Sequence, residues 1–486
     1  MNLSVQDDLL HRRLQQICGY SEFRYPQREV IEAIVNQQDA LIILPTGGGK
    51  SLCFQLPALM QAGLTIVISP LVALMENQVQ DLRQRQLPAA MLHSEMPSQQ
   101  RKQVLWMLEN QKLRLLYLSP ETLLSQPVWQ RLCEPSLKIN ALIVDESHCL
   151  AQWGETFRPA YFRLGTVRSS LLQHKPAGSR IAIAAFTATA NPTTQAAIEQ
   201  ILQLETPQIF RFNPYRANLQ LSVQSVATPH QRRQRLIEVI QSHLNQSGLV
   251  YVRSRREAES LTQWLQSQGY KTAAYHAGLK STERRTIEQS WIQDQIQFVV
   301  CTCAFGMGIN KPSTRWIVHF HAPFLLSEYV QEIGRAGRDG KPAIAVILKS
   351  AWFDFEDRSR WNFFEEQERS RFIKAQELIR KLPKQGNVDE VFKKFEQAVI
   401  SLSLLHQSKQ LIWHNPFHYE ITSINKLPQE SLMNSTRSMR NYFRVKDCRW
   451  AFLLRSFGFE QDAIDFSCGT CDQCKAKLKH RSLLGS

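Results

Sequence analysis

The sequence predicts an α/β protein in which two parallel-sheet lobes follow one another and a mainly helical region with a cysteine cluster comes last. Short apolar runs alternate with amphipathic helical stretches in two successive series, as expected for parallel sheets buried on both faces. After about residue 350 the pattern changes to long polar–apolar helices, and four of the ten cysteines gather near the C-terminus. We therefore expect lobes at 1–205 and 206–350, a helical insert at 351–430, a cysteine-rich subdomain at 431–474 and a basic tail at 475–486.

Each lobe contains five apolar runs that predict its buried strands. In the first lobe they cover residues 39–45, 64–70, 113–120, 141–147 and 180–190. In the second lobe they cover residues 248–254, 271–278, 298–304, 315–322 and 343–349. Two such lobes in tandem predict a cleft between them.

Composition narrows the class of partner. The chain has 486 residues, enough for two to four domains, and a formal net charge of +15. This excess of positive charge favours a polyanionic binding partner, either nucleic acid or an acidic membrane surface. The longest apolar stretch, LTIVISPLVALM, is too short to span a bilayer and contains Pro70. The N-terminal residues lack the apolar core of a signal peptide, so we expect a reducing, cytosol-like compartment.

The stretch LIILPTGGGKS (residues 41–51) predicts a phosphate-binding loop between a strand and a helix. Its glycines allow backbone N–H groups to surround phosphates, Lys50 can neutralise phosphate oxygens, and Ser51 can bind Mg²⁺. Leu44 stands where the strict G-x-x-x-x-G-K-[ST] pattern has its first glycine, so the pattern match is incomplete. The predicted phosphate contacts are Thr46, Gly47, Gly48, Gly49, Lys50 and Ser51.

Charged residues farther along the chain complete the predicted phosphate chemistry. Asp145 and Glu146 end an apolar strand, where Asp145 can hold Mg²⁺ and Glu146 can orient or deprotonate the attacking water. In the second lobe, Arg335 and Arg338 lie three residues apart, so one helical face can present both. They can offset negative charge on a γ-phosphate, although a solvated basic face is the alternative interpretation.

Taken in order, these motifs resemble those of the RecQ family within the superfamily 2 helicases. GYSEFRYPQ is similar to the family's adenine-reading motif, which implies that Phe23, Arg24 and Gln27 form the base pocket. DESHC is similar to motif II, with Ser147 in place of the usual alanine, and FTATA resembles motif III. YVQEIGRAGRDG resembles the second-lobe motif that implies catalytic roles for Gln331, Arg335 and Arg338.

The stretch CLAQWGETFRP resembles the aromatic-rich loop that is diagnostic of the family and senses single-stranded DNA. Bases can stack on Trp153 or Phe157, and Arg158 can meet a phosphate. Glu155 stands where the family commonly has histidine. Outside this resemblance, a buried core pair is the favoured interpretation of Trp153 and Phe157.

The resemblance implies two RecA-like domains and an ATP- and Mg²⁺-dependent 3′–5′ DNA helicase. Its expected partners are single-stranded DNA and forked or tailed duplex, with roles in recombination and repair. We expect a cytoplasmic protein, nucleoid-associated in a bacterium. The alternatives are a DNA-stimulated ATPase or translocase with weak strand separation, a non-enzymatic DNA-binding module, and RNA unwinding.

Cys448, Cys468, Cys471 and Cys474 suit a closed tetrahedral Zn²⁺ site, because the last three follow a C-x₂-C-x₂-C spacing. An iron–sulfur cluster uses similar spacing, and unligated thiols are the third interpretation. The family carries zinc with this arrangement. The sequence ends twelve residues after Cys474, so we expect a short form without the domains that usually follow zinc.

The insert before the zinc module departs most from the family pattern. Three helical stretches at 371–383, 387–395 and 395–411 precede a predicted hairpin at 411–424. This is the order of a winged helix, and a plain helical spacer is the alternative. We expect the insert to substitute for a missing winged helix, with YEITSI (residues 419–424) forming a wing against DNA.

Overall fold

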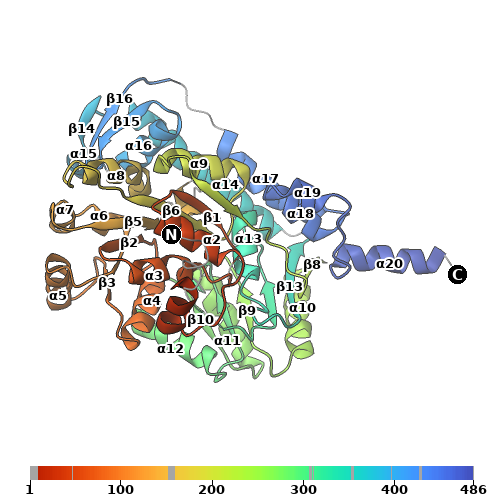
Figure 1. Ribbon diagram of the computed structural model, residues 1–486. Helices are drawn as coiled ribbons and strands as arrows, with labels where there is room; N and C mark the ends of the chain where they lie inside the picture. The colour runs from red at the N-terminus through yellow and green to blue at the C-terminus, as the bar shows by residue number, and fades with distance from the viewer. Residues whose placement is uncertain are drawn as a thin grey trace. The chain divides into compact units, whose positions relative to one another are not determined.

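The computed structural model describes residues 9–45, 47–150, 159–305, 309, 311–351, 355–395, 397–425 and 430–484. The chain forms two compact units, each made of two segments of the sequence (Figure 1). Unit 1 contains Met1–Phe212 and Glu368–Pro428, and unit 2 contains Asn213–Gln367 and Gln429–Ser486. Part of the predicted insert therefore belongs to the same unit as the first lobe.

Unit 1 is built on a seven-stranded sheet in the order β3-β4-β2-β5-β6-β1-β7, and all its pairings are parallel. Its strands are β1 (Ala40–Ile43), β2 (Leu64–Ile68), β3 (Ala89–Leu92), β4 (Leu115–Leu118), β5 (Ile139–Val144), β6 (Ala182–Thr187) and β7 (Gln208–Arg211). The central strands are aliphatic at nearly every position because both faces are covered. In β1, Leu41 and Ile43 join one apolar core, and Ala40 and Ile42 join another.

Helices cover this sheet on the two sides. They are α2 (Gln27–Val35), α3 (Lys50–Met60), α4 (Val72–Gln84), α5 (Ser98–Glu109), α6 (Pro120–Leu123), α7 (Gln126–Leu132), α8 (Val167–Leu172) and α9 (Pro192–Leu202). Three further helices are a π-helix, η1 (Leu14–Cys18), and two 3₁₀-helices, η2 (Ser147–Leu150) and η3 (Pro159–Thr166). The neighbouring parallel strands β5, β6 and β1 have their carboxyl ends on the same side of the sheet. Ligands of open α/β sheets bind at this side.

Unit 2 contains a second parallel sheet of six strands in the order β10-β11-β9-β12-β13-β8. Its strands are β8 (Leu219–Val226), β9 (Gly248–Tyr251), β10 (Thr272–Tyr275), β11 (Phe298–Cys301), β12 (Trp316–His319) and β13 (Ala343–Ser350). Its helices are α10 (Pro229–Ser242), α11 (Arg255–Ser267), α12 (Ser281–Ile292), α13 (Leu326–Ile333), α17 (Glu430–Arg444), α18 (Arg449–Ser456), α19 (Glu460–Ala463) and α20 (Asp472–Leu484). The predicted fold class, two RecA-like parallel sheets with a helical C-terminal region, is confirmed.

The insert forms a small antiparallel sheet with helices. Its helices are α14 (Phe355–Ile379, which continues from unit 2), α15 (Val388–Lys394) and α16 (Ala398–Gln407). Its strands are β14 (Gln385–Asn387), β15 (Leu411–Asn415) and β16 (His418–Ile421), in the order β14-β16-β15. Helix, strand, two helices and a hairpin, with the last strand in the centre of the sheet, is the order of a winged helix. The insert therefore contains a sheet as well as helices, and the winged-helix interpretation stays a prediction.

Candidate nucleotide site and zinc centre

The predicted phosphate loop lies at the carboxyl end of β1 and leads directly into α3. Gly47 and Gly49 have φ of 85° and 75°, a left-handed conformation that glycine adopts without strain. Gly49 is the N-cap of α3, so Lys50 and Ser51 occupy its first turn. The N-terminus of a helix favours anions because its first N–H groups have no partner within the helix. Thr46 lies outside the described residues.

Gln27 connects the predicted base pocket to this loop. Its side-chain oxygen accepts a hydrogen bond from the Arg24 backbone N–H (2.9 Å), and its Nε2 donates to the Gly48 and Gly49 carbonyls (3.3 and 3.4 Å). A Cβ added at Gly49 would lie 2.2 Å from Gln27 Nε2. A larger residue would therefore displace the Gln27 side chain and would also be strained by the positive φ of 75° at this position. Phe23 is half-buried and packs edge-on against His11, with ring centroids 5.2 Å apart.

Asp145 and Glu146 follow β5 directly, at the same side of the sheet, where the carboxyl ends of its strands lie. Asp145 is 5% exposed, and its Oδ1 accepts a hydrogen bond from the Glu146 backbone N–H (2.9 Å). Burial and then the charge of Glu146 raise the pKa of Asp145 to about 7, while the charge of Lys50 lowers it. The two acids and Lys50 therefore lie close enough to affect one another electrostatically.

A buried polar chain connects Glu146 to the end of β6. His148 Nδ1 lies 3.3 Å from Glu146 Oε2 and 3.1 Å from Thr187 Oγ1. The Thr187 hydroxyl in turn donates to the Thr189 carbonyl (3.0 Å). Burial lowers the pKa of His148, which favours the neutral ring. Motif II thus contacts motif III through His148, a role that the sequence analysis did not assign.

In unit 2, the side chain of Arg335 is buried and that of Arg338 is half-buried. Arg335 is 9% exposed. Arg338 donates from Nε to the Gly334 carbonyl (3.3 Å) and from Nη1 to the Ile309 carbonyl (3.2 Å), and burial lowers its pKa to about 10. Gln331 lies on α13 with a half-buried side chain. All three residues therefore belong to one helix and the turn that follows it.

Helix α13 also carries a buried carboxylate that forms ion pairs within unit 2 and that the sequence analysis missed. Glu332, next to Gln331, accepts hydrogen bonds from Arg253 Nη2 (3.1 and 3.3 Å), and its Oε2 lies 2.8 Å from His319 Nε2. Burial alone would raise the pKa of Glu332, but the Arg253 charge and the His319 hydrogen bond outweigh it and lower the pKa. The His319 ring stacks on Tyr251, with centroids 5.3 Å apart.

Replacing Glu332 with glutamine should destabilise unit 2, because it leaves the Arg253 guanidinium buried without its closest counter-charge. Breaking a buried ion pair costs about 3–5 kcal/mol. Glu328→Gln is the matched control, since Glu328 is more exposed and lies 3.5 Å from Arg253 Nη1. Its cost should stay below about 1 kcal/mol. Urea denaturation of the two variants measures the change. Equal unfolding midpoints would contradict a stabilising role of the buried Arg253–Glu332 ion pair.

The four cysteines of the predicted metal site come together in unit 2. Their sulfur atoms all lie within 4.8 Å of one another. Tetrahedral zinc with Zn–S bonds of about 2.3 Å places sulfurs about 3.8 Å apart, and Cys468 Sγ lies 3.9 Å from Cys474 Sγ. Backbone N–H groups of Cys468 and Cys471 donate to the sulfurs of Cys448 and Cys468 (both 3.3 Å). The donor set and spacing fit a structural Zn²⁺.

Side chains around the cysteines attach this module to the edge strand β8. Arg449 forms a two-pronged ion pair with Asp472 (2.6 and 2.7 Å). Asp472 Oδ2 also accepts from the Val223 N–H (3.1 Å), and Trp450 Nε1 donates to the Leu219 carbonyl (3.1 Å). The metal module therefore covers backbone groups that an edge strand would otherwise expose.

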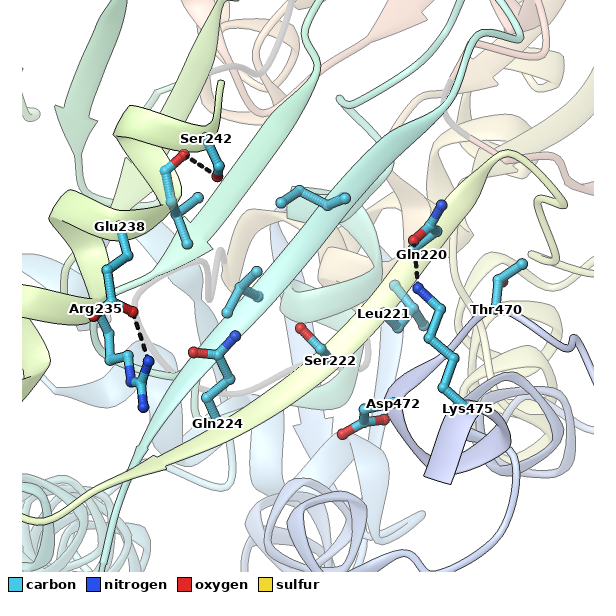
Figure 2. Close-up of a pocket in the computed structure, with 13 residues that line it drawn as sticks. Gln220, Leu221, Ser222, Gln224, Arg235, Glu238, Ser242, Thr470, Asp472 and Lys475 are labelled. Carbon is cyan, nitrogen blue, oxygen red and sulfur yellow. Dashed lines mark hydrogen bonds and ion pairs between the residues drawn. The ribbon is translucent and has the colours of Figure 1, made fainter. Parts of the chain in front are cut away.

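A cleft of about 370 Å³ lies between α10, the β8–β13 edge and the start of α20 (Figure 2). Its polar side chains include Gln220, hydrogen-bonded to Lys475 Nζ (3.0 Å), and the Arg235–Glu238 ion pair (2.6 Å). It contains none of the residues predicted to contact the nucleotide. It is therefore separate from the candidate phosphate site.

The predicted DNA-contacting residues Trp153, Phe157 and Arg158 lie outside the described residues, as does Glu155. Their roles stay predictions. Among the helices of the described residues, none is long and apolar enough to cross a membrane.

Comparison with known proteins identifies the family. The DEAD/DEAH box helicase family matches residues 24–198, and the helicase conserved C-terminal domain matches residues 231–340. The ATP-dependent DNA helicase RecQ of Synechocystis sp. is 47% identical over 470 residues, which cover 96% of this chain and 98% of that protein. The probable ATP-dependent DNA helicase RecS of Bacillus subtilis is 39% identical over 71% of this chain and 68% of its own length.

Solved structures agree on the fold. The DUF1998 helicase MrfA bound to DNA has a TM-score of 0.58 at 18% identity, covering 90% of this chain and 61% of that one. Mycobacterium smegmatis helicase Lhr, bound to single-stranded DNA and AMP-PNP, has a TM-score of 0.56 at 18% identity, covering 88% and 61%. With the near full-length match to the Synechocystis protein, the resemblance is confirmed: the chain belongs to the RecQ family of ATP-dependent DNA helicases.

Proposed function

We propose that this chain hydrolyses ATP to move 3′ to 5′ along single-stranded DNA and to unwind forked or tailed duplex, in DNA recombination and repair. The proposal rests on a cluster of predicted phosphate-binding and catalytic residues at the carboxyl ends of the strands in unit 1. There the glycine loop, Lys50, Asp145 and Glu146 lie together, and Gln27 contacts the loop. A cytoplasmic location, beside the nucleoid if the host is a bacterium, suits this function.

Within the cluster each side chain has a chemical task. The glycine loop and Lys50 bind the phosphates, Gln27 with Phe23 and Arg24 reads the base, and Glu146 orients or deprotonates the attacking water. Ser51 and Asp145 would hold Mg²⁺, which prefers oxygen ligands and supplies charge neutralisation when bound. The Asp145–Glu146 pair fits a cation, because burial and then the charge of Glu146 raise the pKa of Asp145 to about 7. Gln331, Arg335 and Arg338 act on the γ-phosphate and its surroundings.

DNA is the expected activator of this chemistry. Trp153 and Phe157 stack on bases, which is worth about 1–3 kcal/mol per base, and Arg158 binds a phosphate. These residues follow Asp145 and Glu146 closely in sequence. Binding of a strand there can therefore alter the position of the catalytic acids.

Strand displacement on matched forks tests the polarity. With ATP and Mg²⁺, the protein should release the labelled strand from a 3′-tailed duplex at least about tenfold faster than from a 5′-tailed one, since each cycle moves one strand in one direction. A blunt duplex of the same sequence is the control. Release from the 5′-tailed substrate alone would contradict the assigned polarity.

An ATP-driven DNA translocase with weak strand separation is the second candidate function. It is favoured by one observation: the turn of the insert hairpin, which directly precedes the stretch YEITSI that we expected to lie against DNA, is buried within unit 1. Single-stranded-DNA-stimulated ATP hydrolysis without strand release from either fork would favour this candidate.

A further inference from the structure

The turn of the β15–β16 hairpin, the wing of the winged-helix topology, packs into the core of unit 1. Phe417, at this turn, is 9% exposed and belongs to the same apolar cluster as Leu41 and Leu142 of the large sheet. Its ring packs edge-on against Trp129 of α7, with centroids 5.3 Å apart and planes at 78°. A wing that reads DNA must expose its turn. This turn is therefore not available to DNA, and the role of YEITSI (residues 419–424) as a wing stays a prediction.

Arg163 of η3 holds the turn from the other side. Its Nε donates to the Pro416 carbonyl (2.5 Å), its guanidinium lies 5.6 Å from the centre of the Phe417 ring, and its Nη2 lies 3.9 Å from Asp389. Burial lowers the pKa of Arg163 to about 10, so it stays charged at neutral pH. A charge buried this deeply is retained only with partners, and here the insert supplies three of them.

Helix α16 also faces inward. Its residues Ser401 to Leu405 are all buried, and the Ser401 hydroxyl donates to the Ala375 carbonyl of α14 (2.9 Å). At its end, the His406 ring packs edge-on against Phe162 of η3, with centroids 5.9 Å apart. In winged helices the second of two consecutive helices enters the DNA groove. Both elements that would read DNA are thus used for packing against η3 and its surroundings.

We propose that Arg163 and Phe417 are positioning residues that anchor η3 to the insert and so make DNA stimulation of ATP hydrolysis depend on the insert. The argument is one of chain connectivity. Residues 151–158 join η2, which follows the catalytic acids directly, to η3. A DNA strand bound by residues 151–158 can displace the catalytic acids only if the far end of this segment, at η3, is held in place. The inference rests on the proposed function, in which this segment senses DNA.

The test compares ATP hydrolysis with and without single-stranded DNA in point variants. Phe417→Ala should lower the DNA-stimulated kcat about tenfold or more, because small displacements of catalytic groups have effects of this size. The rate without DNA should stay within about twofold of wild type. Phe417→Leu, which keeps an apolar side chain, should restore most of the stimulation. Deleting the insert would instead open the core that Phe417 completes.

Ile412→Ala is the matched control, since Ile412 lies on the same hairpin but is 52% exposed. It should leave both rates unchanged. Arg163→Lys, which keeps the charge but loses the Nε donor, provides a second variant if Phe417→Ala folds poorly. Full stimulation in folded Phe417→Ala and Arg163→Lys would overturn the inference, as would equal losses with and without DNA. If the wild type shows no stimulation by DNA, the proposed function fails first.

Discussion

Replacing Lys50 with alanine should lower the rate of ATP hydrolysis about 10²–10³-fold, the usual cost of losing one group that stabilises transition-state charge. Lys50 begins α3 at the phosphate loop and lies close enough to Asp145 to lower its pKa. Its loss removes the cation that offsets charge on the phosphates. Steady-state phosphate release at saturating single-stranded DNA measures the effect.

Lys102→Ala is the control for this prediction. Lys102 is exposed on α5, away from the phosphate loop in sequence, and its removal changes the net charge equally. It should keep near wild-type hydrolysis. If both variants lose activity to the same extent, general charge rather than the site explains the effect.

Replacing Cys471 with serine should abolish zinc binding and unfold the C-terminal module. Cys471 is fully buried and belongs to the apolar core of unit 2, so a lost ligand also disrupts packing around β8. Structural Zn²⁺ contributes about 10–16 kcal/mol of binding free energy in small zinc modules. We expect about one zinc per chain in the wild type and almost none in the variant, with a lower melting temperature.

Metal analysis of the purified proteins and thermal melting measure these changes. Cys133→Ser is the control, since Cys133 lies in unit 1 and outside the cysteine cluster. Wild-type zinc content in Cys471→Ser would contradict the assignment. Iron in place of zinc, with a brown protein, would identify an iron–sulfur cluster instead.

Which strands could be predicted depended on where they lie in the sheets. The ten continuous apolar runs all form strands, because a strand covered on both faces must be apolar throughout. The missed strands β3, β7, β8 and β14 all lie at sheet edges, and of the ten predicted strands only β10 does. β8 reads LQLSVQSV, alternating apolar and polar, and β7 is mostly exposed, so neither has a continuous apolar signal. β3 is only four residues long.

In the candidate site, too, some residues could be predicted from a local sequence pattern and others depend on partners far away in the sequence. The roles of Lys50, Asp145 and the cysteines depend on local spacing, so the sequence could indicate them. Glu332 is different, because its partner Arg253 lies 79 residues away in sequence. The burial of Phe417 likewise depends on Trp129 and Arg163, which only the folded chain brings close. No local pattern marks a wing that packs inward.

The most direct test of the central claim is strand displacement on a 3′-tailed fork, with the wild type and Lys50→Ala side by side. Our account predicts ATP-dependent release of the labelled strand by the wild type and none above background by the variant. Wild-type ATP hydrolysis without release would contradict the helicase assignment, and equal release by both proteins would show that Lys50 does not drive it.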